Sequence, residues 1–192
     1  MYTRPWLKEY KSLVNQIKST MGGKIKISNL NEPSSHIGSD RVHTMAEEEH
    51  YPSYWGELDG YGLRIELESH NTPETLVLSV LIGHDHYIII RPENLFDSFM
   101  KKIKFSSEFL TGKNEFDNTL FIDRLQSSDK PLVSNPNFQD LALKIMPFCE
   151  LRIRRGQVEM TFEVNDATML SYDFIESRVV SLVEIAKIIK PK

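Results

Sequence analysis

The stretch Cys149–Phe162 reads CELRIRRGQVEMTF and consists of two alternating runs around Arg155-Gly156. If those two residues form the turn of a hairpin, apolar side chains meet on one face and polar side chains on the other. The apolar pairs are Cys149–Phe162, Leu151–Met160 and Ile153–Val158. The polar pairs are Arg152–Glu159 and Arg154–Gln157. Because one register satisfies both faces, the sequence predicts an antiparallel hairpin here.

A second hairpin is predicted in YWGELDGYGLRIELES, residues 54–69, where Asp59-Gly60 separates two alternating runs. One face would receive the pairs Tyr54–Ile65, Gly56–Leu63 and Leu58–Tyr61. The other face would receive Trp55, Glu57, Arg64 and Glu66.

Four further segments have strand patterns. Thr75–Ile82 and Tyr87–Ile90 are apolar on both faces, which is typical of central strands, and Gly83-His84-Asp85-His86 joins them. Short alternating runs at Lys24–Ile27 and Thr119–Arg124 predict two more strands. We therefore expect a sheet of about six to eight strands.

Helical patterns lie on both sides of these strands. Apolar residues recur at three- and four-residue steps over residues 5–21, before Gly22-Gly23. Helices are also predicted at 136–146, after the capping residue Asn135, and at 168–190. Residues 95–103 fit a helix, with a strand as the alternative. The fold class is therefore α+β, an antiparallel sheet of hairpins packed against two or three helices, including a long C-terminal helix.

The chain is expected to form a single domain, in which a long loop separates an N-terminal helix and strand from the rest. Residues 1–27 would hold an amphipathic helix and a short strand, and residues 54–192 the α+β domain. Residues 28–53 have little periodicity and contain Glu47-Glu48-Glu49, so we expect a long loop there.

Composition excludes several classes of protein. The 192 residues carry a net charge of -4, which disfavours a dedicated nucleic-acid binder. The longest apolar run, Leu76–Ile82, is too short to span a bilayer. Cys149 is the only cysteine, and the first residues lack the pattern of a signal peptide, so we expect a reducing, cytoplasmic environment.

The N-terminal segment is basic. Its first 27 residues carry six lysines and arginines against Glu9 alone. This charge permits peripheral binding to an anionic membrane or to phosphate, although such lysines more often form the solvated face of a helix.

His84 and His86 form the best metal candidate, because alternate residues of an extended segment project to one side. A divalent ion such as zinc would need further ligands from His43, His50 or Glu47–Glu49. A polar turn between two strands explains the same histidines without a metal. No other cofactor is indicated.

Two features of the predicted sheet suggest an interaction surface. Arg152 and Arg154 would point the same way and, with Arg155, offer an anion-binding edge, unless Glu159 neutralises Arg152. Trp55 opposite Arg64 would form a cation-π pair, and an exposed Trp55 would instead anchor a partner.

Nucleophile patterns are weak. Ser127-Ser-Asp-Lys130 fits Ser-x-x-Lys but lacks the partner motifs of that enzyme class, which favours a turn. Cys149 would face inward opposite Phe162, as a small core residue.

The stretch FLTGKNEFDNTLFIDR, residues 109–124, has the residues of a corner. Gly112 can supply a positive φ, Phe116 can be buried, and Asp117 or Asn118 can hydrogen-bond to the exposed backbone. It lacks the first Gly and the Ser/Thr of a phosphate loop.

Thr111-Gly112, Glu115-Phe116-Asp117 and Leu120-Phe121-Ile122 together resemble the T-G-D-x-x-F-D-x-x-F-x-V signature of uncharacterised bacterial domains. The resemblance spans roughly Tyr54 to Ile189. It departs at Lys113 or Asn114, where those domains have Asp, and in the membrane helices that several of them carry. It implies a bacterial source and no established enzymatic activity, and it supplies no catalytic residues.

The sequence therefore favours a non-enzymatic interaction or accessory module with an unknown protein partner, because no set of nucleophile, base and orienting residue can be assembled. A metal-binding protein or metal-dependent hydrolase at His84 and His86 is the alternative. Peripheral binding through the basic N-terminal helix is the second alternative. The sequence leaves the oligomeric state open.

Overall fold

The computed structural model describes residues 6–26, 51–68, 73–83, 86–97 and 109–190. The helices are α1 (Leu7–Met21), α3 (Asn114–Thr119), α4 (Lys130–Val133), α5 (Pro136–Lys144) and α6 (Tyr172–Ile189), with 3-10 turns η1 (Ser127–Asp129) and η2 (Ala167–Leu170). The strands are β1 (Lys24–Lys26), β2 (Ser53–Leu58), β3 (Tyr61–Glu68), β4 (Thr75–Leu81), β5 (Tyr87–Pro92), β6 (Leu120–Leu125), β7 (Glu150–Arg154) and β8 (Gln157–Glu163). Residues 28–50 of the expected loop and residues 98–103 of the expected helix lie outside the described residues.

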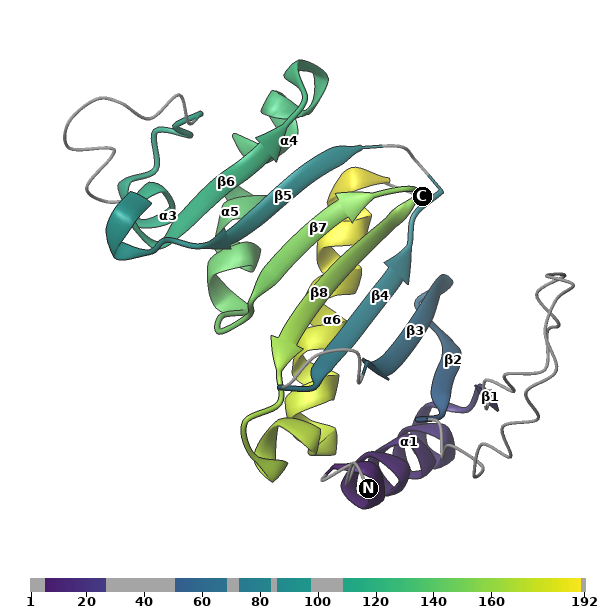
Figure 1. Cartoon of the computed structure of the whole chain (residues 1–192). Coiled ribbons are helices and arrows are strands. Elements are labelled where there is room, and N and C mark those ends of the chain that lie inside the picture. The colour runs from purple at the N-terminus through teal and green to yellow at the C-terminus, as the bar shows by residue number, and fades with distance from the viewer. Residues whose placement is uncertain (1–5, 27–50, 69–72, 84–85, 98–108, 191–192) are drawn as a thin grey trace, which may run out of the picture.

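The eight strands form one antiparallel sheet in the order β1-β2-β3-β4-β8-β7-β5-β6 (Figure 1). The α+β class, the antiparallel sheet and the long C-terminal helix are thus confirmed. Although β4 and β5 follow one another along the chain, the β7–β8 hairpin lies between them. Both are therefore interior strands of the sheet, as their apolar sequences predict.

Both predicted hairpins form in the predicted register. Tyr54 pairs with Ile65 in the first, and Leu151 pairs with Met160 in the second. Both residues of each turn have positive φ, 52° and 77° at Asp59-Gly60 and 51° and 74° at Arg155-Gly156. Turns of this kind match the right-handed twist of the flanking strands.

The core lies between one face of the sheet and the helices. On β3 the buried residues alternate strictly, and they are Tyr61, Leu63, Ile65 and Leu67. α5 and α6 lie across this side of the sheet (Figure 1). α1 belongs to the same core, because Tyr10 and Val14 are fully buried and the Tyr10 hydroxyl donates to the Ile65 carbonyl at 3.1 Å.

Capping residues set the starts of α5, η2 and α6. The Asn135 side chain accepts a hydrogen bond from the Asn137 N–H at 2.9 Å, which starts α5 where the sequence predicts. The start predicted for the C-terminal helix was four residues too early. Asp166 caps η2, and Ser171 then caps α6 separately.

Cys149 does not face the core. The thiol is exposed, and its sulfur accepts the Glu163 N–H at 3.3 Å. The prediction assumed that the strand continues through residue 149. β7 instead begins at Glu150, and the neighbouring Phe148 takes the buried position.

The stretch at 109–124 turns a corner, as predicted, and also forms the short helix α3, which the sequence analysis missed. Asp117 accepts hydrogen bonds from the Thr111 N–H at 3.0 Å, the Thr111 hydroxyl at 2.8 Å and the Gly112 N–H at 3.0 Å. Gly112 has φ 86°, and Phe116 is fully buried. These contacts hold the corner against the core.

Gly56→Ala is expected to destabilise the fold by about 1–3 kcal/mol, because an added side chain overpacks the core. A Cβ at position 56 would lie 2.1 Å from the hydroxyl oxygen of the fully buried Tyr54. Gly62→Ala is the matched control, since the atoms nearest to its Cβ would belong to the half-exposed Leu81 side chain, with Cδ1 closest at 2.9 Å. Urea unfolding measures both variants. Equal stability of the two would contradict this packing.

Candidate functional site

The side of the sheet opposite α5 and α6 carries mainly polar side chains. We call it the open face. Its residues are Trp55, Arg64, Glu66, Val77, Ser79, Leu81, Tyr87, Ile89, Glu150, Arg152, Arg154, Gln157, Glu159 and Thr161. They occupy alternate strand positions, so the register of the two hairpins brings all four sheet residues of the sequence prediction, Trp55, Arg64, Arg152 and Arg154, to one surface.

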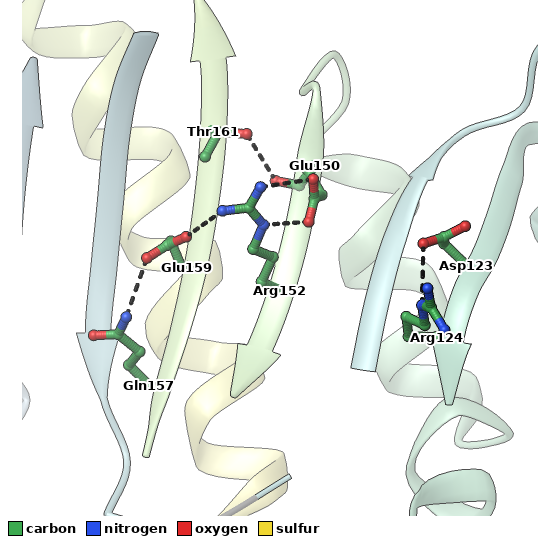
Figure 2. A network of polar contacts seen from close by, with 7 residues as sticks. All are labelled: Asp123, Arg124, Glu150, Arg152, Gln157, Glu159 and Thr161. Carbon is green, nitrogen blue, oxygen red and sulfur yellow. Dashed lines mark hydrogen bonds and ion pairs between the residues drawn. The ribbon is translucent and has the colours of Figure 1, made fainter. Parts of the chain in front are cut away.

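Arg152 lies at the centre of a polar network on this face (Figure 2). Its guanidinium donates to both carboxylate oxygens of Glu150, one of them at 2.9 Å, and to Glu159 at 3.2 Å. Gln157 donates to the other oxygen of Glu159 at 3.1 Å. Hydrogen bonding to Glu150 raises the pKa of Arg152 above its ordinary value, and the charge of Glu159 adds to this effect. Arg152 is therefore neutralised by the carboxylates on both sides.

The predicted pairing of Arg152 with Glu159 is thus present, and Glu150 is a partner that the sequence analysis missed. The sequence does contain a signal for this contact: Glu150 and Arg152 are two residues apart on one strand, which places both side chains on the same face. Arg154 lies half-buried opposite Gln157 in the register.

Trp55 lies between two cations at the other end of the face. The Arg64 guanidinium carbon is 4.9 Å from its ring centroid, and the Lys26 ammonium is 4.2 Å from it. Arg64 also forms an ion pair with Glu66, which accepts a hydrogen bond from the Ser53 hydroxyl at 2.7 Å. The expected Trp55–Arg64 cation-π pair is therefore formed, and the ring is half-buried by the cations around it.

Two large apolar side chains are exposed along one row of the open face. Leu81, Gln157, Arg154 and Tyr87 stand opposite one another on successive strands. Leu81 is 46% exposed and Tyr87 is 40% exposed. Aromatic and arginine side chains of this kind are enriched at protein interfaces.

The His86 imidazole makes a contact that the sequence analysis did not predict. Its Nδ1 lies 2.9 Å from one oxygen of Asp129, whose other oxygen accepts the Tyr87 N–H at 2.9 Å. Asp129 is only 3% exposed. Burial raises the pKa of Asp129, but hydrogen bonds from the Tyr87 N–H, His86 and Ser128 outweigh burial and leave that pKa below its ordinary value. The carboxylate thus ties η1 to the start of β5.

His84 lies outside the described residues, so its position relative to His86 stays a prediction. Among the residues that the structure describes, no three His, Cys, Asp or Glu side chains form a group suited to a metal ion. The same part of the chain contains no helix long and apolar enough to cross a membrane.

The Ser-x-x-Lys pattern at 127–130 forms η1 and the start of α4. The Ser128 hydroxyl donates to Asp129 at 3.3 Å. The Lys130 ammonium lies 5.4 Å from the centroid of the Phe109 ring. These contacts agree with the prediction that the segment is a turn.

The helical layer offers a hollow of about 420 Å³ between α5 and α6, lined by Asn137, Asp140, Leu141, Glu184, Lys187 and Ile188. Its charges have partners within the fold. Lys187 contacts Glu184 at 2.6 Å and Asp59 at 2.8 Å. This hollow is separate from every residue that the sequence analysis selected.

No protein-family model matches the chain. No curated protein matches it either. A crystal structure of the mycobacterial trehalose monomycolate transport factor A, TtfA, is similar with a TM-score of 0.57 and 10% identity, over 97% of each chain. At this identity the similarity concerns the fold alone, and it extends over almost the whole of both chains.

Asp129→Asn is expected to lower the free energy of unfolding by about 1–3 kcal/mol at neutral pH, because charge-assisted hydrogen bonds are lost. The folded-state pKa of Asp129 is lowered, so its stabilisation is present above the unfolded-state pKa of about 4 and is lost as the pH falls through the folded-state pKa. Denaturant unfolding of both proteins from pH 7 to pH 3 should show the difference shrinking below about pH 4.

The matched control is Asp123→Asn, because Asp123 is exposed and lies 3.8 Å from Arg124. It should change stability by less than about 0.5 kcal/mol. A difference between wild type and Asp129→Asn that stays constant down to pH 3 would show that the charge of Asp129 does not contribute.

Proposed function

We propose that this protein is a non-enzymatic interaction module whose binding surface is the open face of the sheet. The observation that carries this proposal is the gathering of five residues on one broad surface opposite the helices. They are Trp55, Tyr87, Arg152, Arg154 and Gln157. Tryptophan, tyrosine and arginine supply most of the residues that dominate binding energies at protein interfaces.

The charges of the open face favour a protein, and not a polyanion, as its binding partner. Arg152 is paired with Glu150 and Glu159, and Arg64 is paired with Glu66. A nucleic acid or an anionic membrane attracts arginines that are not already neutralised, and would be repelled by the glutamates. A protein surface that carries charges of both signs can pair with the arginines and with the glutamates. The similar structure belongs to a protein named as a transport factor, and a helper role for this chain agrees with that name.

Photo-crosslinking tests the location of the surface. With p-benzoyl-phenylalanine in place of Gln157 on the open face, irradiation in cells is expected to give a discrete protein adduct. The same amino acid in place of Val180, which is exposed on α6, is the control. Adding Trp55→Ala should weaken adduct formation about tenfold, as for a typical interface anchor.

Equal adduct formation at both positions, or adducts at position 180 alone, would overturn the proposal. Thermal unfolding of each variant is measured in parallel, so that loss of an adduct is assigned to the surface only in folded protein.

Metal-dependent chemistry at His86 is the second candidate function. The observation in its favour is the buried Asp129 carboxylate, which orients the imidazole as carboxylates orient histidines at metal and catalytic sites. Elemental analysis of the purified protein decides between the two. Near-equimolar zinc that is lost on His86→Ala would favour the metal function, whereas zinc equal to the buffer blank would count against it.

A further inference from the structure

We infer that the open face packs against the open face of a second copy of this chain, in a two-fold dimer with its axis perpendicular to the strands. This inference rests on the proposed use of the open face and names its occupant. The two edges of the sheet, the size of the face and the positions of its charges all favour this dimer.

Both edges of the sheet oppose the addition of another strand. β1 at one edge has only three residues, and two of them are lysines. β6 at the other edge has a bulge, because Arg124 pairs with Ile89 and Ile122 with Ile90, which leaves Asp123 as the extra residue. Short strands, lysines, bulges and charged residues are devices that prevent edge pairing. A second copy would therefore meet the face of the sheet rather than its edge.

The open face is large enough for a stable dimer. Eight strands at a spacing of about 4.8 Å, with an average length of about 20 Å, give an area of about 700 Å². A standard interface buries about 800 Å² on each partner. A face-to-face pair of sheets is also a common packing arrangement, with the strands of the two sheets nearly aligned.

The charges of the face form two rows across the sheet. The arginine row consists of Arg64, Ser79, Glu159 and Arg152, which stand opposite one another on β3, β4, β8 and β7. The glutamate row consists of Glu66, Val77, Thr161 and Glu150 on the same four strands. On β3 and on β7, an arginine and a glutamate are thus two residues apart.

Two in-plane axes keep the strands of the two copies aligned, and they differ in the charges that they bring together. An axis parallel to the strands places β3 of one copy on β7 of the other, so Arg64 meets Arg152 and Glu66 meets Glu150. An axis perpendicular to the strands, between the two rows, places each arginine row on the glutamate row of the second copy. Arg64 then meets Glu66 of the second copy and gains a second carboxylate, and Arg152 meets Glu150 of the second copy and gains a third. Like charges disfavour the first arrangement, and opposite charges favour the second.

Sedimentation equilibrium at low ionic strength tests the dimer, because exposed charges are screened by salt. Wild-type protein is expected to be dimeric. Glu66→Lys/Glu150→Lys makes both rows basic, and Arg64→Glu/Arg152→Glu makes both rows acidic. Each variant alone is expected to be monomeric, and an equimolar mixture of the two is expected to dimerise. Lys18→Glu/Lys144→Glu, on the exposed surfaces of α1 and α5, is the control and should remain dimeric.

Circular dichroism and thermal unfolding confirm that each variant is folded. Monomeric wild type at 200 µM, a dimer that persists in both charge variants, or a mixture that stays monomeric would each overturn the inference. Crosslinks from position 157 to a different protein, with a monomeric wild type, would retain the proposed function and reject the second copy as its partner.

Discussion

The alternation of side chains along β3 and along the β7–β8 hairpin is the constraint on which the rest of the structure depends. Because successive residues of a strand point to opposite faces, one register sends Leu63, Ile65, Leu151 and Ile153 under the helices and Arg64, Glu66, Glu150 and Arg152 to the other side. A shift by one residue would exchange the two faces. The positive-φ turns at Asp59-Gly60 and Arg155-Gly156 therefore determine both the core and the candidate site.

The open face carries many charged side chains, but positive and negative charges are paired on it. Arg64 and Arg152 contact glutamates of the same surface, so this part of the face presents donors and acceptors in a fixed pattern with little net field. Such a surface selects partners through matching positions of charge and shape more than through long-range attraction. This is consistent with a role in protein interaction. Small residues such as Ser79 and Thr161 lie between these long charged side chains on the same face. They are buried although they point away from the core.

Most of the fold was predictable from local patterns. Both hairpins, α1 and α5 were visible because periodicity, turn residues and caps agree at those positions. The order of the strands was not predictable, because the insertion of β7–β8 between β4 and β5 depends on contacts between distant segments. For the site, register alone placed Trp55 opposite Arg64 and Arg152 opposite Glu159. The His86–Asp129 contact joins residues 43 positions apart and left no local signal. Cys149 was misplaced because a strand pattern was extended by one residue past its end.

Carboxyl footprinting with a carbodiimide is the measurement that tests the central claim most directly, since it reports the accessibility of individual glutamates on folded protein. If the open face is the binding surface and a second copy is its partner, modification of Glu66 and Glu150 should fall as the protein concentration rises, whereas modification of Glu176 on α6 should stay constant. Protection of Glu176, with Glu66 and Glu150 unchanged at every concentration, would contradict the account and move the binding surface to the helical layer.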